Sequence, residues 1–561
     1  MCLVVPGRLH QLSAAVVPVA LGLGVLALQR AGGVVMFDDE IGFLGEAVSF
    51  SARDAADPVF RGKPFYSAGY PALLAGPLSV LDADPWAVAV GVNLVLLATL
   101  GPLLRHLVVR TVPVSPAAAT VAAIVGASVP AVLLQLPRAW TEICLAAGFA
   151  AWAALALRHL RPGAHRWAVP LGLLTGALLS VHRRMLAVVA VTAVLLVGRA
   201  VHQAVTARRD PAGQPRSATP WVWMAAGLTA LAASLAGALA LDRYVLDRIY
   251  DGVTSGSRTQ KAEVLATLDW VPTLAGHAWS MLATTAGLAG VGVVALAWLA
   301  WRGEQRGWAV AVLAAALGVT AISVVFLTNG IRADQLVYER YVSPVVPVLV
   351  AVAVASLLAR SRSAWPSMLA SVGALVALGA VLALTVADDR LRGNVQKMTV
   401  PTLVGLDVPT VGWGEPYARA IHVAPITALA LAGAVAAFAL LRRGWGPGLV
   451  VVGLWAGVLV LSSAGSLRPF LDLWEPVGRS AAARLEAEGT EVLQYAPDLR
   501  HEVRNVVQYR MGYPEVRLIE LDTCPAEPLF LGPEGLEGAA FPVEVIDAVP
   551  QFGGVLYRAG C

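Results

Sequence analysis

Apolar residues form long runs along residues 1–465, and short polar segments separate each run from the next. Each run contains about twenty mostly apolar residues, enough for a helix to cross ~30 Å of hydrocarbon. Inside lipid every backbone N–H and C=O must be bonded within its own segment, so these runs are predicted to be helices. Their number predicts about thirteen membrane spans. The predicted spans lie near residues 12–30, 86–104, 117–136, 141–157, 167–181, 185–201, 221–241, 278–301, 308–328, 341–359, 365–387, 424–441 and 448–465.

The pattern changes after residue 465, where the apolar runs shrink to the length of strands. Two helix-like stretches, residues 476–487 and 498–511, alternate with these runs. The strand-like runs are Val492–Tyr495, Val516–Ile519 and Val543–Ile546. We therefore predict a polytopic α-helical membrane domain over residues 1–465 and a small α/β domain over residues 466–561. The membrane domain has three long loops on one side, residues 31–85, 242–277 and 388–423.

Composition supports a membrane protein. The chain has 561 residues, of which 57% are hydrophobic and 14% charged, with a mean hydropathy of +0.69. Soluble domains are less apolar and carry about 25% charged residues. The net charge of +4 sums arginine-rich and acidic segments, so it does not indicate nucleic-acid binding.

The distribution of arginine predicts the orientation in the cytoplasmic membrane. With the N-terminus inside, the inner loops contain many arginines and only two acids, Asp210 and Glu304. This excess follows the positive-inside rule and places the first long loop and the C-terminal domain outside. The inner arginines are Arg8, Arg105, Arg110, Arg158, Arg161, Arg166, Arg199, Arg208, Arg209, Arg216, Arg302, Arg306, Arg360, Arg362, Arg442 and Arg443.

Several classes of site have no support in the sequence. No Walker A loop, GxGxxG after a strand, HExxH or zinc-spaced Cys/His cluster occurs, which argues against nucleotide and zinc chemistry. Two of the four cysteines, Cys524 and Cys561, share the exported domain. Oxidation is permitted there, so we predict a disulfide between them, the alternative being two free thiols.

Three acids, Asp38, Asp39 and Glu40, stand where the chain leaves the first span. They are typical of a helix start, because acids in the first turn complement the helix dipole. Adjacent carboxylates also repel one another, which raises at least one pKa. A carboxylate perturbed in this way at a membrane surface suits a general base towards a hydroxyl group.

Cations occur in the same outer segments. Lys63 follows in a GKP sequence, where it is either a solvated side chain or a phosphate ligand. Arg340 stands with Tyr341 at the mouth of a late span, where it binds phosphate, or else pairs with Glu339 or a lipid headgroup. Arg183 and Arg184 interrupt a broken span.

The order of these motifs resembles the GT-C membrane glycosyltransferases, above all the branch of bacterial lipid A aminoarabinose transferases and protein O-mannosyltransferases. The resemblance covers the architecture of the whole chain and is most detailed in the first hundred residues and at 338–349. Its matching residues are Asp39-Glu40, Lys63-Pro64, Tyr70-Pro71, Arg340-Tyr341, Pro344 and Pro347, with Glu142 at the end of a short outer turn, Pro137–Glu142.

The resemblance implies transfer of a sugar, with inversion, from a polyprenyl-phosphate donor to a hydroxyl of a glycan, lipid or protein on the outer membrane face. Asp39 is then the base, and Glu40 or Asp38 positions the acceptor or tunes that base. Because the sequence reads Asp-Asp-Glu, Asp38 is the alternative base. The implied donor-phosphate ligands are Lys63, Arg340, Tyr341, Arg183 and Arg184, and the implied substrate-binding residues are Tyr70 and Glu142.

No cofactor is expected. Paired acids suit Mg²⁺ or Mn²⁺, but the resemblance favours a metal-free reaction. The main alternative function is a transporter or flippase of a polyprenyl-linked sugar, and a further one is a non-catalytic scaffold. Transport predicts charges along a path through the bilayer, whereas the charges here cluster at one face. The sequence leaves the sugar, the acceptor and the oligomeric state open.

Overall fold

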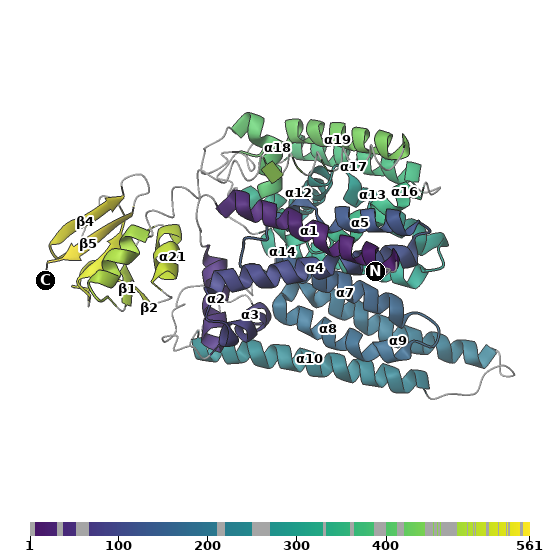
Figure 1. Ribbon diagram of the computed structural model, residues 1–561, viewed down its shortest axis with the longest axis horizontal. Helices are drawn as coiled ribbons and strands as arrows, with labels where there is room; N and C mark the ends of the chain where they lie inside the picture. Colours follow the sequence, from purple (N-terminus) through teal and green to yellow (C-terminus); the bar gives the residue numbers. More distant parts are fainter. Residues whose placement is uncertain are drawn as a thin grey trace, which may run out of the picture.

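The chain forms a helical bundle and a separate small sheet domain, which lies beyond one end of the bundle (Figure 1). The computed structural model describes residues 6–30, 37–51, 67–209, 219–249, 270–328, 333–359, 364–385, 400–411, 420–443, 453, 457, 460–461 and most of 479–560. The elements of the bundle are α1 Pro6–Arg30, α2 Asp38–Phe50, α3 Gly69–Val80, α4 Pro85–Thr111, α5 Pro116–Ala127, α6 Pro130–Leu133, α7 Glu142–His159, η1 His165–Trp167, α8 Ala168–Val181, η2 Arg183–Met185, α9 Leu186–Arg209, α10 Thr219–Ile249, α12 Trp270–Thr284, α13 Leu288–Arg302, α14 Arg306–Leu327, η3 Ala333–Val337, α15 Glu339–Val342, α16 Val346–Leu358, α17 Ala364–Thr385, α18 Pro401–Val411 and α19 Val423–Arg443.

Six of the described helices are long and apolar enough to cross a membrane, and the number rises to eight if each of two bent helix pairs is one span. The chain is therefore a multi-pass membrane protein. The six are α1, α4, α9, α10, α14 and α17, and the bent pairs are α12 with α13 and η3–α15 with α16.

The expected count of about thirteen spans is not confirmed. The predicted span near 448–465 lies mostly outside the described residues, and hydropathy measures apolar content and not the continuity of a helix. The predicted span near 278–301 is bent by 105° at a break between α12 and α13. At this break Gly287 has a φ of +76°, a left-handed conformation that favours glycine. The predicted span near 117–136 is divided into α5 and α6, and the apolar stretch near 167–181 forms the 14-residue helix α8.

Local capping explains where the long helix α4 begins. Asp84 is its N-cap residue, and its Oδ1 accepts a hydrogen bond of 2.9 Å from the backbone N–H of Ala87. Pro85 occupies the first helical position, where its missing N–H costs nothing. Helix α5 begins in the same way. Ser115 is its N-cap residue, Pro116 follows at the first helical position, and Ser115 Oγ accepts the backbone N–H of Ala118 at 3.2 Å.

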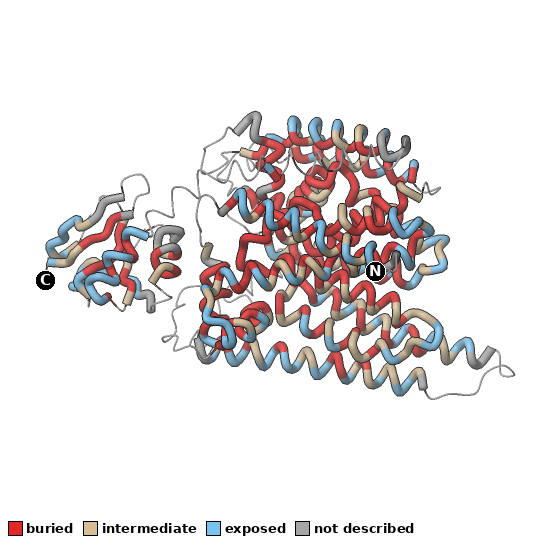
Figure 2. Tube along the Cα trace, viewed as in Figure 1, coloured by how far each residue is buried: buried red, intermediate tan, exposed pale blue. Residues whose placement is uncertain are grey.

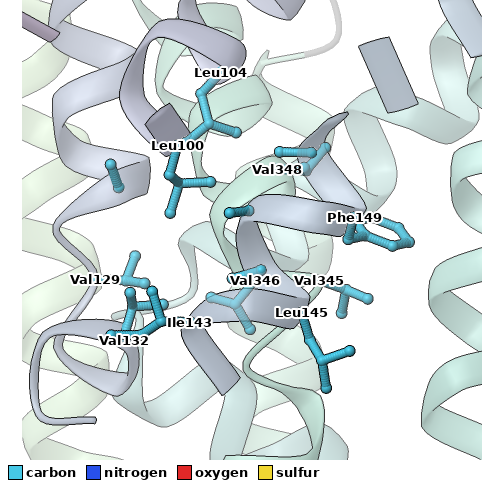
Figure 3. Close-up of a cluster of buried hydrophobic side chains, with 14 of the residues drawn as sticks. Leu100, Leu104, Val129, Val132, Ile143, Leu145, Phe149, Val345, Val346 and Val348 are labelled. Carbon is cyan, nitrogen blue, oxygen red and sulfur yellow. The ribbon is translucent and has the colours of Figure 1, made fainter. Parts of the chain in front are cut away.

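Helix α16 lies at the centre of the bundle. Its residues from Val346 to Leu357 are all buried, and Figure 2 shows the same concentration of buried residues inside the bundle. In Figure 3 Val345, Val346 and Val348 lie among apolar side chains of α4, α6 and α7. Helix α16 therefore holds α15, directly before it, in a fixed position at one end of the bundle.

Helices α7 and α9 run side by side in the same direction, and contacts join them at three heights. Arg184 Nη2, just before α9, lies 3.2 Å from Glu142 Oε1 at the start of α7. Midway, the indole N–H of Trp152 donates to Thr192 Oγ1 at 2.8 Å. At the other end Arg199 donates to the backbone carbonyl of Arg161. We call the two ends of the bundle the carboxylate end, which carries Glu142, and the basic end, which carries Arg161.

The C-terminal domain contains a five-stranded mixed sheet in the order β2-β1-β3-β5-β4. Strand β1 pairs in parallel with β2 and β3, whereas β5 pairs antiparallel with β3 and β4. The described strands are β1 Val492–Tyr495, β2 Glu515–Leu518, β3 Leu529–Gly532, β4 Val543–Val549 and β5 Gly554–Ala559, and the helix α21 is His501–Arg510. The three predicted strands are therefore present, and β3 and β5 are two strands that the sequence pattern missed.

The cysteines of the sheet domain bear on the predicted disulfide. Cys524 is disulfide-bonded. Cys561 lies outside the described residues, so the pairing of Cys524 with Cys561 stays a prediction. Cys144, in α7, is a free and buried thiol.

Candidate active site

The site lies at the carboxylate end of the bundle, where α2 begins. Glu40 is fully buried, and its two carboxylate oxygens accept hydrogen bonds from the backbone N–H groups of Phe37 at 3.2 Å and Ala139 at 3.0 Å. Arg138 Nη1 lies 3.7 Å from Glu40 Oε2. Burial raises the pKa of Glu40, while Arg138 and the two N–H groups oppose the rise. Glu40 therefore joins the start of α2 to the loop before α7, and both of its oxygens already accept hydrogen bonds.

Asp39 points in another direction, because successive residues of a helix are turned by about 100°. Its Oδ2 lies 2.7 Å from Arg340 Nη1, and 19% of its side chain is exposed. Of these two acids, only Asp39 has a partly accessible carboxylate. The side chain of Asp38 lies outside the described residues.

Arg340 connects two carboxylates. It is carried by the one-turn helix α15, and its Nε donates to Glu142 Oε1 at 2.8 Å while Nη1 binds Asp39. The guanidinium carbon lies 3.9 Å from the ring centroid of Trp140, a cation–π contact. The alternative pairing of Arg340 with Glu339 is wrong, because Glu339 Oε1 instead accepts the backbone N–H of Thr402 at 2.8 Å.

Arg184 completes the group from the break between α8 and α9. Its Nη2 donates to the same atom, Glu142 Oε1, at 3.2 Å, and only 1% of its side chain is exposed. Among the described residues, Arg184 Nε and Nη1 have no hydrogen-bond partner. Buried donors are nearly always satisfied in folded proteins, so two free N–H groups on a buried arginine indicate a ligand or water at this point.

An aromatic ring covers this arginine, and two further rings pack against that ring. The guanidinium carbon of Arg184 lies 4.8 Å from the ring centroid of Tyr341. Edge-to-face contacts join Tyr341 to His182 at 5.7 Å and to Tyr338 at 5.0 Å. Burial lowers the pKa of His182 well below its usual value, and the neighbouring Arg184 and Arg340 add to the shift, so the imidazole is neutral.

Two of the other predicted residues, Arg183 and Tyr70, contact different partners. Arg183 Nη2 lies 3.6 Å from Asp242 Oδ2, and its side chain is 37% exposed. Tyr70 is fully buried and donates its hydroxyl to Asn93 Oδ1 at 3.3 Å, which joins α3 to α4. Its predicted contact with substrate stays a prediction. Lys63 lies outside the described residues.

Three residues of the site are absent from the sequence prediction: Arg138, Trp140 and His182. Each lies within four residues of a predicted one, in the Pro137–Glu142 turn or directly before Arg183. The sequence does place Arg138 and Trp140 close to the acid Glu142. This grouping could have identified both residues, since arginine stacks on aromatic rings as well as binding anions.

No metal centre is evident. In the described part of the chain, no three His, Cys, Asp or Glu side chains are grouped closely enough to hold a metal ion. Arginine side chains lie beside Asp39, Glu40 and Glu142 instead.

Comparison with known proteins gives a fold. No family model matches the chain, and no curated protein matches it. Among solved structures it resembles ArnT from Cupriavidus metallidurans bound to undecaprenyl phosphate, with a TM-score of 0.56 and 15% identity over 97% of each chain. The apo structure of the same enzyme gives a TM-score of 0.54 at 15% identity, over 96% of this chain and 97% of that one. ArnT is a GT-C glycosyltransferase. The chain therefore has the GT-C fold, as its outer-loop motifs predicted.

Proposed function

We propose that this protein is an inverting glycosyltransferase that moves a sugar from a polyprenyl-phosphate donor to a hydroxyl acceptor at the outer face of the cytoplasmic membrane. One observation carries the proposal: a partly exposed carboxylate, Asp39, pairs with the buried Arg340, and Glu142 joins Arg340 to Arg184, which has two free N–H groups among the described residues. This arrangement supplies a base and a phosphate site within one cluster. The GT-C fold and the undecaprenyl phosphate bound to ArnT support the choice of donor.

Asp39 is the proposed base. Its partial exposure lets an acceptor hydroxyl approach, whereas Glu40 is fully buried with both oxygens already accepting hydrogen bonds. Arg340 Nη1 lies 2.7 Å from Asp39 Oδ2 and holds that oxygen in place. The remaining oxygen, Asp39 Oδ1, is the atom that we assign to the acceptor hydroxyl.

Arg184 is the proposed main ligand of the donor phosphate, with Arg340 beside it. Glu142 Oε1 accepts a hydrogen bond from both arginines and so fixes their relative position before any substrate arrives. The free N–H groups on Nε and Nη1 of Arg184 are the donors that we assign to the phosphate oxygens. Lys63 and Tyr341 remain proposed ligands of the same phosphate.

The reaction balances with these residues alone. The acceptor oxygen attacks the anomeric carbon, its proton passes to Asp39, and the bond between that carbon and the phosphate oxygen breaks. The electron pair leaves with the polyprenyl phosphate, which gains negative charge that the arginines stabilise. Attack opposite the leaving group inverts the anomeric configuration. Glu142 Oε2 has no hydrogen-bond partner among the described residues and is assigned to a hydroxyl of the donor sugar.

The test is donor consumption by the purified full-length protein. A panel of polyprenyl-phosphate sugars is incubated with the protein, and the release of polyprenyl phosphate is followed. We expect Asp39→Asn to lower turnover by about 10²-fold or more, because it removes a general base. The matched control is Asp247→Asn, since Asp247 is exposed and, in the described part of the chain, pairs with the exposed Arg243 on α10.

Full turnover by Asp39→Asn would contradict the assignment of the base. Movement of the intact donor across a vesicle membrane, with no release of polyprenyl phosphate from any donor, would instead indicate a flippase.

A further inference from the structure

A second group of charged residues occupies the basic end of the bundle, away from the candidate active site. We call Arg110, Arg158, Arg161 and Arg199, together with His106 and His159, the basic cluster. Helix α7 begins at Glu142 and ends at His159, and its 18 residues span about 27 Å at 1.5 Å per residue. This is close to the thickness of the hydrocarbon core, so the two clusters belong to opposite membrane surfaces.

The members of the cluster lie close to one another in space. Arg110 ends α4, Arg158 and His159 end α7, and Arg161 follows directly. Arg199, on α9, donates to the backbone carbonyl of Arg161. Burial lowers the pKa of Arg161, and the positive charges of Arg110 and Arg158 lower it further.

The cluster lacks compensating acids. The sequence contains no Asp or Glu from residue 85 to 141 or from 143 to 209, the segments that supply every member. In the described part of the chain none of the four arginines forms an ion pair. One acid, Glu304, lies in a neighbouring turn. Gly307, three residues later, lies against Leu160, because a Cβ on Gly307 would meet Leu160 at 3.6 Å. The side chain of Glu304 is exposed.

Arginines on one side of a membrane protein follow from the positive-inside rule, and arginines in the last turn of a helix complement its dipole. These two rules account for Arg110 and Arg158. They do not account for Arg199, which lies well inside α9 and is only 8% exposed. A buried and uncompensated guanidinium is costly unless an anion joins it.

Free donors mark the position of that anion. Among the described residues, Arg199 Nε and Nη1 have no hydrogen-bond partner, and neither has either ring nitrogen of the buried His159. Arg199 is also close enough to His159 and His165 to act on both rings electrostatically. Trp167, whose ring lies 4.7 Å from the guanidinium carbon of Arg158, covers one side of the group. Tryptophan at this depth is typical of the headgroup region.

We propose that the basic cluster is a binding site for an anion that carries a phosphate group, held chiefly by Arg199 and Arg161. The phosphate belongs either to an anionic lipid headgroup or to a free phosphate compound, and both offer the same oxygens to the arginines. The site is separate from the proposed donor site and does not depend on the proposed glycosyl transfer.

The experiment uses the purified full-length protein in a neutral detergent, and binding is titrated by native mass spectrometry. The probes are phosphatidylglycerol, phosphatidylcholine as the lipid without net charge, and inorganic phosphate. The variants are Arg199→Gln and Arg161→Gln, and the second keeps the backbone carbonyl that Arg199 uses. Arg302→Gln is the control, since Arg302 is exposed and contacts only Trp298 and Trp301 among the described aromatic rings.

We expect wild type and Arg302→Gln to bind phosphatidylglycerol more tightly than phosphatidylcholine, and each cluster variant to weaken that binding about tenfold. If inorganic phosphate competes for the same site and shows the same tenfold loss, the source is a free phosphate compound. If it does not compete, the source is the lipid headgroup. Equal binding of phosphatidylglycerol and phosphate by wild type, Arg199→Gln and Arg161→Gln would overturn the proposal. Should Arg199→Gln fail to fold, Arg161→Gln decides the result alone.

Discussion

At the scale of single residues, one helical position separates two carboxylates with different surroundings. Glu40 accepts two backbone N–H groups and is fully buried, whereas Asp39 contacts Arg340 and remains partly exposed. Because neighbours on a helix point about 100° apart, adjacent acids reach different environments. The two residues therefore contribute differently, Glu40 to the anchoring of α2 and Asp39 to the proposed chemistry.

Arg184 gives a prediction about the donor phosphate. Arg184→Lys keeps the positive charge but removes the separate Nε and Nη1 donors of the planar guanidinium, so binding of the leaving phosphate becomes weaker. We expect kcat/KM for the polyprenyl-phosphate sugar to fall about tenfold, equal to ~1.4 kcal/mol of transition-state stabilisation. Arg183→Lys should have a smaller effect, because Arg183 is partly exposed and lies beside Asp242. Equal losses in both variants would contradict the assignment.

Glu40 gives a prediction about pH. Burial raises its pKa in the folded protein above the ordinary value of 4.5, so folding favours the protonated carboxyl. The stability that this provides is present below about 4.5 and is lost as pH rises through the folded pKa. We expect Glu40→Gln, which cannot ionise, to reduce the fall in melting temperature over this range. Thermal unfolding of both proteins in detergent at several pH values measures this fall. If the melting temperature of Glu40→Gln depends on pH as that of wild type does, the result contradicts a raised pKa of Glu40.

At the scale of elements, breaks in apolar helices position the site. The break between α8 and α9 presents Arg184, and the bend of 71° between η3–α15 and α16 presents Arg340. At the N-terminus of η2, His182 Nδ1 accepts the backbone N–H of Arg184 at 3.2 Å, which helps to hold the first break. A continuous helix would carry these arginines along its sides, where they could not meet at Glu142.

The break at Gly287 gives a prediction about stability. Its φ is +76°, and a Cβ there would lie 3.0 Å from Ser371 Oγ, which donates to the carbonyl of Gly287 at 2.6 Å. We expect Gly287→Ala to destabilise the protein by ~1–2 kcal/mol, because a residue with a Cβ is strained in the left-handed conformation. Gly373→Ala is the control, since a Cβ on Gly373 meets no atom within 4 Å in the middle of α17. A lower melting temperature is expected for the first variant only.

At the scale of the whole molecule, the sheet domain docks on the end of the bundle that carries the site. Figure 1 shows α21 on the side of the sheet domain that faces α2. The hydroxyl of Tyr509, on α21, donates to Asp84 Oδ2 at 2.6 Å at the start of α4. Phe37 packs against the cores of both the bundle and the sheet domain. The residue before the carboxylates of α2 is thus shared by the two domains.

This docking gives a prediction for the complete protein. Tyr509→Phe removes the hydrogen bond to Asp84 but keeps the ring, so both domains should remain folded while the contact between them weakens. We expect faster hydrogen–deuterium exchange in residues 501–510 and around 84–87 than in wild type, measured by mass spectrometry. Tyr244→Phe is the control, because Tyr244 lies on α10 with 56% of its surface exposed. Exchange that is unchanged in Tyr509→Phe would show that this contact does not hold the domain.

Some of this structure could be predicted from the sequence. Long apolar runs and sparse charge determined a multi-pass membrane protein, and three of the five strands followed from short apolar runs. Three candidate residues far apart in the chain, Asp39, Glu142 and Arg340, were also identified, because charged side chains beside spans are rare and need partners. These conclusions depend on the hydropathy and charge of short segments, and both properties can be read from the sequence directly.

Only the tertiary structure decided how these residues are paired and where the spans break. Asp39 and Arg340 are 301 residues apart, and their contact depends on how α2 and α15 are packed. Hydropathy does not report a bend of 105° or a left-handed glycine, so it does not show where an apolar helix breaks. The sequence by itself determined which segments are apolar and which residues carry charge. The packing of distant helices decided which charges meet, because pairing depends on distances that the linear order does not contain.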